Sequence, residues 1–168
     1  MSTPQKAKGK YFESRIAEHI RNTLNLRENE CVRSPNSGNG EFEFGDLFFP
    51  DPIKYPYVFE CKFGYEWDLK ALFPKLNKQL SKFLRQNQEA VDKYRKKMNM
   101  EPRFSGVILS KPYFDPILLT NFYECDLIET TRIVTEDEDG NRVFVYPLNE
   151  GLKILFELQE DPLYGRQN

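Results

Sequence analysis

Apolar residues recur along the chain with two different periods, and these periods predict its secondary structure. In residues 5–24 they lie at steps of four, which is typical of a helix that buries one face. A second helical pattern, rich in lysine and arginine, runs from Asp68 to about Met98 with Pro74 as a break or a first-turn residue. The short, β-branched run 104–110 predicts a buried strand after this basic helix.

The remaining segments predict strands and turns. Residues 41–49 and 57–63 are predicted strands, and the turn-rich PDPIKYP between them indicates a hairpin. Residues 131–147 predict another hairpin that turns at Asp139-Gly140-Asn141, while 30–33 are extended, 34–40 form a loop, and 148–160 are helix or strand. Because strand, helix and strand follow one another at 57–110, we predict an α/β fold with a central mixed β-sheet flanked by α-helices.

Length and composition bound the class of protein. A chain of 168 residues fits a single domain, 1–168, and 39% hydrophobic residues can form its core. No apolar run approaches the length of a membrane span, so we expect a cytoplasmic protein without membrane contact. With one histidine and three widely separated cysteines, a structural zinc site and a Cys–His or Ser–His catalytic pair are disfavoured.

Charge is segregated along the chain although its net value is only -2. Residues 41–69 are acidic and lie between the basic segments 1–40 and 70–103, and residues 104–168 are acidic again. A cation site within a polyanion-binding surface needs this pattern, since metals bind carboxylates and phosphates bind lysine and arginine. For 70–103 a merely solubilising helix face is an equally good interpretation.

The acidic segment contains the candidate chemistry. Alternation along the strand puts Glu60 and Lys62 on one face and Phe59, Cys61 and Phe63 on the other. Asp46 on the neighbouring strand would converge with Glu60, and a Mg²⁺ ion would relieve the repulsion between the two carboxylates. Lys62 would then position or deprotonate a water and stabilise charge on a phosphoryl group. A Glu-x-Lys pair alone is also common on ordinary surface strands.

Further residues upstream complete a pattern. Gly9 to Glu13 on the first helix, Val32 to Gly38 in the loop, Gly45-Asp46-Leu47 and Glu60-Cys61-Lys62 occur in the order and spacing of a known family. The chain resembles the PD-(D/E)xK nuclease superfamily, and within it the archaeal-type Holliday junction resolvases, some of them carried by bacteriophages. The resemblance covers about residues 9–110 and implies a restriction-endonuclease-like nuclease core; residues 111–168 form a C-terminal extension of unassigned role.

The resemblance implies a role for each matching residue. Asp46, Glu60 and the main-chain carbonyl of Cys61 would hold Mg²⁺, for which Mn²⁺ could substitute, and Glu13 would bind the metal directly or through water. Lys62 would activate or orient the water, Ser37 would approach the scissile bond, and Arg33 would lie near the phosphate. Simple helix-surface and turn roles are the alternatives for Glu13 and Ser37.

The family also implies a homodimer that acts on a four-way junction. Trp67, Phe73, Phe48 and Phe49 are candidates for the dimer surface, although core packing is their alternative role. The acidic pI of about 5.6 departs from the basic character of resolvases. Candidate DNA contacts are basic residues on the predicted helices and near the site: Lys10, Arg33, Lys70, Lys75, Lys78, Lys82, Arg85, Lys93, Arg95, Lys96 and Lys97.

The main hypothesis is therefore a Mg²⁺-dependent endonuclease that resolves Holliday junctions by paired nicks. The first alternative is another nuclease of the same superfamily, such as a phage exonuclease or a restriction-like enzyme, because Asp–Glu–Lys chemistry does not select the substrate. The second is a non-catalytic DNA-binding protein on the same fold. A structural protein with a coincidental motif is the third.

Overall fold

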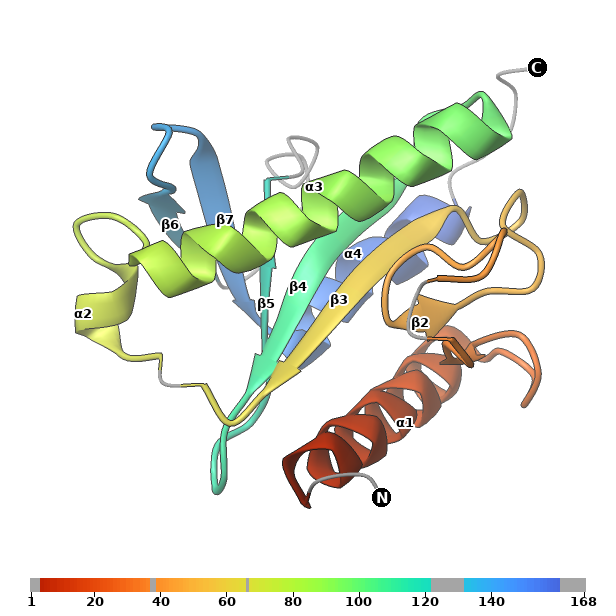
Figure 1. Ribbon diagram of the computed structural model, residues 1–168, viewed down its shortest axis with the longest axis horizontal. Coiled ribbons are helices and arrows are strands. Elements are labelled where there is room, and N and C mark those ends of the chain that lie inside the picture. Colours follow the sequence, from red (N-terminus) through yellow and green to blue (C-terminus); the bar gives the residue numbers. More distant parts are fainter. Residues whose placement is uncertain (1–3, 37–38, 66, 122–131, 161–168) are drawn as a thin grey trace.

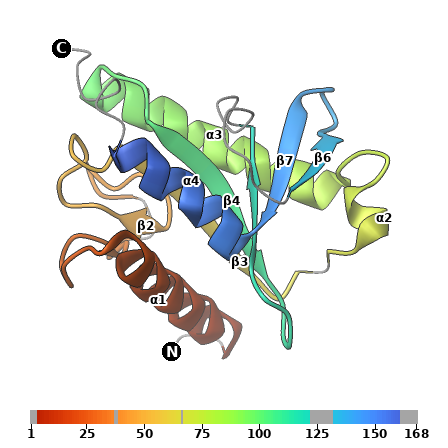
Figure 2. The same ribbon diagram turned by 180° about the vertical axis from the view of Figure 1, so that it is seen from behind.

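The computed structural model describes residues 4–36, 39–65, 67–121 and 132–160. A five-stranded mixed sheet of order β3-β4-β5-β7-β6 forms its centre (Figure 1). Helix α3 covers one face of this sheet, and α1 and α4 lie on the other (Figures 1 and 2). The predicted α/β fold is confirmed. The strands are β3 (Tyr57–Phe63), β4 (Phe104–Ser110), β5 (Ile117–Thr120), β6 (Ile133–Glu136) and β7 (Arg142–Pro147), and the helices are α1 (Pro4–Leu24), α2 (Leu69–Leu72), α3 (Lys78–Met98) and α4 (Leu148–Glu160).

Strands β3 and β4 are parallel and are joined by the crossover through α2 and α3. The predicted long helix is divided: α2 ends at Leu72, and Asn77 caps α3 by accepting a hydrogen bond from the Leu80 N–H. Pro74 lies in the connection between the two helices, in agreement with the predicted break. Leu80, Phe83 and Leu84 of α3 are buried against the sheet.

The C-terminal part of the chain extends the same sheet. β5 pairs antiparallel with β4 and with β7, and β6 and β7 form the predicted hairpin. Residues 148–160 are a helix, whose buried Leu148, Leu152 and Leu155 join the core cluster that also contains Phe12 and Ile16 of α1. The described part of the C-terminal extension, to which the sequence assigns no role, therefore contributes three strands to the sheet and apolar side chains to the core.

The predicted hairpin between 41–49 and 57–63 is wrong. Residues 41–46 are not a strand, and β2 (Leu47–Phe48) pairs antiparallel with β1 (Val32–Arg33) instead. The contact with β3 is a single parallel bridge between Gly45 and Phe59. The physical reason is the connection at 50–56, which is anchored by a turn from the Tyr55 N–H to the Asp51 carbonyl and returns the chain in the same direction.

None of the helices in the described part of the chain has the length and the apolar composition that a membrane span requires.

Candidate active site

Strand β3 presents its two faces to different helices. Phe59 and Cys61 belong to the core cluster on the α1 side, and Phe63 packs against that cluster. Glu60 and Lys62 alternate with them and form an ion pair, with 3.1 Å between Lys62 Nζ and Glu60 Oε2. The Lys62 ammonium lies 5.5 Å from the centre of the Phe83 ring, which comes from α3. The Glu60–Lys62 pair is therefore held on a rigid strand, on the face that α3 covers.

Asp46 is fixed by two hydrogen bonds to the edge of β3 and by a third to Ser34. Its N–H donates to the Phe59 carbonyl at 2.8 Å, its carbonyl accepts from the Ser34 N–H at 2.8 Å, and its Oδ2 accepts from the Cys61 N–H at 2.8 Å. Gly45 makes this approach possible: its φ is +85°, and a Cβ there would lie 2.3 Å from the Phe59 carbonyl oxygen. The position of Asp46 thus depends on the glycine before it.

The first helix brings Glu13 to the same region. Its Oε2 lies 3.8 Å from Arg33 Nη1, an ion pair between α1 and β1. Burial raises the pKa of Glu13, and the negative charge of Asp46 raises it further, while Arg33, Lys62 and Lys10 act in the opposite direction. Glu13 and Asp46 therefore share one electrostatic environment, and Lys10 and Arg33 are the cations beside it.

The pKa of Glu60 is strongly raised. Burial and the charge of Asp46 raise the pKa of Glu60 to about 7, although Lys62 opposes the shift. Burial lowers the pKa of Lys62, but the charges of Glu60 and Asp46 outweigh it, and the net pKa is raised. Asp46 and Glu60 face the single ammonium of Lys62, which leaves an excess of negative charge beside β3, while Glu13 is paired with Arg33.

This excess is what a bound divalent cation would neutralise. Hard cations bind carboxylate and carbonyl oxygens, and Asp46, Glu60 and the main chain at Cys61 offer such atoms, so the residues present fit a Mg²⁺ or Mn²⁺ ion. Among the described residues, no group of three or more His, Cys, Asp or Glu side chains stands in metal-binding geometry. The fit therefore rests on the uncompensated Asp46–Glu60 repulsion.

The remaining predicted site residues are distributed differently. Ser37 lies outside the described residues. Lys75 and Arg85 form ion pairs with acidic residues of the β6–β7 hairpin, at 3.8 Å to Glu136 Oε2 and 3.2 Å to Glu138 Oε2. Lys78 and Lys82 are exposed on α3. The acidic hairpin thus partly neutralises the basic start of α3.

The aromatic residues considered for a dimer surface do not form one exposed patch. Phe49 is 4% exposed and packs in the core, which is its alternative role. Trp67 is half-buried and lies edge to face with Phe114 at 6.0 Å between ring centres. Phe73 is exposed and Phe48 half-buried.

A buried carboxylate, Glu43, was not predicted. It accepts hydrogen bonds from the Ser34 hydroxyl at 2.6 Å, the Asn36 N–H at 3.0 Å and the Asn36 side-chain amide at 2.9 Å. Lys93 of α3 donates to the main-chain carbonyls of Gly40 and Glu43. We call Glu43, Ser34 and Asn36 the Glu43 cluster; it fixes the loop that runs from β1 to Asp46. In the sequence, the short distance between SPN and EFEF was the available signal for this cluster, but it does not show that Glu43 bonds to Ser34 and Asn36.

An α/β sheet with a Glu-x-Lys pair on its edge strand, an aspartate hydrogen-bonded to that strand and a helical glutamate defines a nuclease core of the PD-(D/E)xK type. Residues 4–104 match the model of the family described as "Phage putative PDDEXK endonuclease". Because this match covers more than half of the chain, the chain belongs to that family. No curated protein and no solved structure matches it.

Proposed function

We propose that this chain is a Mg²⁺-dependent endonuclease that cuts branched DNA and, as a homodimer, resolves four-way junctions by paired nicks. The observation that carries the catalytic part is the corner where Asp46 raises the pKa of the partly buried Glu60 beside Lys62. Perturbed groups of this kind cluster at functional sites. The order of the four motifs along the chain supports the junction as the substrate.

Each residue has a proposed role. Asp46, Glu60 and the Cys61 carbonyl would hold Mg²⁺ or Mn²⁺, with Glu13 contributing directly or through water. Such an ion, when bound, acidifies a water and neutralises charge on a phosphoryl oxygen. Lys62 keeps its proton at neutral pH because Glu60 and Asp46 raise its pKa, so it orients the attacking water and stabilises transition-state charge rather than acting as a base.

The DNA contacts follow from charge. Arg33 lies beside Glu13 and would contact the scissile phosphate, and Ser37 is proposed to approach the same bond. Lys10, Lys75, Lys78, Lys82 and Arg85 would contact phosphates away from the site. Lys75 and Arg85 would first have to leave Glu136 and Glu138, which weakens their contribution.

A second candidate is another phage nuclease that acts without dimer symmetry, such as an exonuclease or a restriction-like enzyme. The burial of Phe49 and the packing of Trp67 on Phe114 favour it, because they remove two of the residues that would form the dimer surface. A non-catalytic DNA-binding protein is the least favoured alternative, since Glu13, Asp46, Glu60 and Lys62 are all present.

The test is cleavage in Mg²⁺ buffer of an immobile four-way junction, a flap, a linear duplex and a single strand of matched sequence. Asp46→Ala is the inactive control, and Glu41→Ala, an exposed carboxylate away from β3, is the active control. We expect symmetric nicks near the branch that require Asp46. Degradation from DNA ends would refute junction resolution and support the second candidate. The absence of any Asp46-dependent product on all four substrates would refute the nuclease activity.

A further inference from the structure

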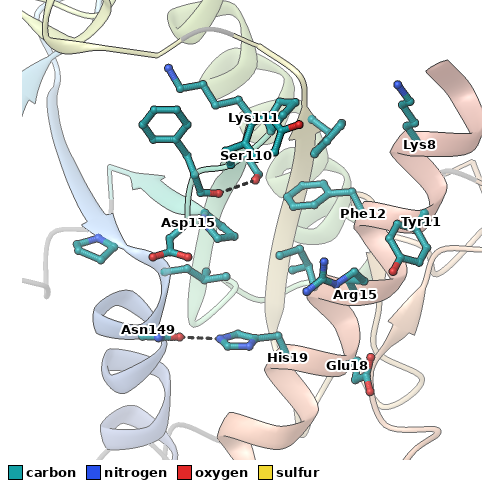
Figure 3. A pocket seen from close by; sticks show the side chains of 18 of the residues that line it. Lys8, Tyr11, Phe12, Arg15, Glu18, His19, Ser110, Lys111, Asp115 and Asn149 are labelled. Atoms are coloured by element: carbon teal, nitrogen blue, oxygen red, sulfur yellow. Dashed lines mark hydrogen bonds between the residues drawn. The ribbon is translucent and has the colours of Figure 1, made fainter.

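A cleft with a volume of about 940 Å³ lies on the flank of α1 opposite Glu13. Helix α1 forms one wall, the connection from β4 to β5 forms another, and the start of α4 closes one end (Figure 3). We call it the α1–α4 cleft. Its closed end is marked by a hydrogen bond between His19 Nε2 and Asn149 Oδ1, at 2.7 Å.

The cleft and the catalytic corner are neighbours along the chain. Phe12 lines the cleft and directly precedes Glu13, and Phe63 lines the cleft and directly follows Lys62. Their rings are in contact, with 5.4 Å between centres, and they separate the two sites. Because Lys62 and Phe63 alternate to opposite faces of β3, a DNA strand bound at both sites would pass around the edge that β3 forms in the sheet.

The walls of the cleft combine cations with exposed aromatic rings. Arg15 lies 5.9 Å from the ring centre of Tyr11, which is 67% exposed. Lys111 lies 4.3 Å from the ring centre of Phe114, which is 56% exposed. Lys8 adds a third positive charge to the lining of the cleft, and Glu18 and Asp115 add two negative charges. Cations alternating with aromatic rings are the surface that proteins use for single-stranded nucleic acid.

Tyr113 gives the most specific indication. It is fully exposed at the tip of the β4–β5 connection, and its φ is +67°, a left-handed conformation that is unfavourable for a bulky residue. The unfavourable backbone conformation is not offset by packing of the Tyr113 ring, which is exposed. Such a cost is expected where a side chain is positioned for a ligand. An exposed ring face in this position is free to stack on a base, and an unpaired strand presents such base faces.

We propose that the α1–α4 cleft holds one unpaired DNA strand next to the catalytic corner, with Tyr113 stacking on a base. This inference rests on the proposed nuclease function and narrows its substrate to DNA with an unpaired strand beside the cleaved bond, as in a flap or an opened junction. Arg15, Lys8 and Lys111 bind the phosphates of that strand, and Tyr11 offers a second ring.

The experiment is fluorescence anisotropy with labelled oligo-deoxythymidine in EDTA, so that no cleavage interferes. Tyr113→Ala is expected to weaken binding by about tenfold, the usual effect of losing one stacked ring, and Tyr113→Phe to retain it. Phe42→Ala is the matched control, since Phe42 is 47% exposed but lies outside the cleft, and it should bind like the wild type. Equal affinity of Tyr113→Ala and the wild type would overturn the proposal, and so would equal affinity for duplex and single strand.

Cleavage by the wild type separates this proposal from the nuclease itself. Cleavage that depends on Asp46, with no Tyr113-dependent binding of the oligonucleotide, would refute the cleft alone. Tyr113-dependent binding without cleavage of any DNA would refute the nuclease and leave a single-strand-binding cleft. If both hold, the ratio of flap to duplex cleavage should fall in Tyr113→Ala.

Discussion

Glu43 is a buried carboxylate and Glu60 a partly buried one on an adjoining segment, and the two are stabilised in different ways. Glu43 accepts hydrogen bonds from the Ser34 hydroxyl and from two N–H groups of Asn36, all neutral donors. Glu60 has a bond from Lys62 but faces the like charge of Asp46, and its pKa is raised to about 7. A carboxylate held by several hydrogen bonds serves the fold, whereas one that faces a like charge is suited to bind a cation.

Removing Lys62 should have the largest effect, and only on the Glu60 side of this comparison. We expect Lys62→Ala to reduce the cleavage rate by about 10²–10⁴-fold, since a group that orients the reacting water contributes that much. DNA affinity in EDTA should change little. Single-turnover cleavage measures the effect, and Lys153→Ala, which changes an exposed lysine on α4, is the control. Wild-type turnover of Lys62→Ala would remove this residue from the mechanism.

Removing Glu43 should instead damage the fold. Glu43→Ala removes the acceptor of the buried Ser34 hydroxyl and of the exposed Asn36 amide, and we expect a loss of about 1–3 kcal/mol in the free energy of unfolding. Urea denaturation measures it. Glu41→Ala, two residues away and exposed, should lose less than about 0.5 kcal/mol. A stable Glu43→Ala protein that binds no Mg²⁺ would reverse the roles assigned to the two glutamates.

The raised pKa of Glu60 makes the metal-free protein sensitive to pH. A carboxyl whose pKa is higher in the folded state stabilises the fold below its ordinary pKa of 4.5, and this contribution is lost as pH rises towards 7. In EDTA, Glu60→Gln should therefore be more stable than the wild type at pH 8, by about 2–3 kcal/mol, but not at pH 4. Urea midpoints at the two pH values test this. An advantage of equal size at both would show that burial of charge is not the cause.

Metal binding should offset the loss of stability that ionised Glu60 causes at pH 8. At ten times its dissociation constant, Mg²⁺ should stabilise the wild type at pH 8 by about 1.4 kcal/mol. Asp46→Asn/Glu60→Gln should show no such gain, while Glu41→Gln should show all of it. Thermal melting with and without Mg²⁺ provides the measurement, and Ca²⁺ serves as a second probe. Stabilisation that persists in the double variant would refute the proposed ligands.

The smallest effect concerns the β6–β7 hairpin. Its Glu136 and Glu138 form exposed ion pairs with Lys75 and Arg85, and such pairs contribute little stability. Glu136→Gln/Glu138→Gln should change the unfolding free energy by less than about 1 kcal/mol but strengthen DNA binding at low salt, because two cations are released. Anisotropy with duplex DNA tests it. Unchanged affinity would show that this end of α3 does not contact DNA.

Much of the fold follows from local patterns in the sequence. The periods of apolar residues predicted α1, α3, β3, β4 and the β6–β7 hairpin, because each buries one face or one short run. The pairing of residues 41–49 was not predictable, since a glycine that permits a parallel bridge to Phe59 looks like any turn residue in the sequence. β5 is four residues long and depends on β4 and β7 for its partners.

The candidate site was predictable to the same degree. The order of Glu13, Asp46, Glu60 and Lys62 indicated a common site, and their roles stay proposals. Their electrostatic coupling depends on burial, which only the tertiary structure supplies. The exposure of Phe42 and the burial of Glu43 do not follow from EFEF, because this segment begins as a turn and not as the predicted strand.

The packing of α1 against α4 has a consequence for the order of folding. His19 and Asn149, which join these helices, are 130 residues apart in the chain. During synthesis the apolar face of α1, with Ile16 and Ile20, is made long before the helix that helps to cover it. Contacts this distant in sequence slow folding, and until they form the incomplete chain exposes hydrophobic surface that is prone to aggregation. The nascent protein should therefore depend on chaperones until α4 has left the ribosome.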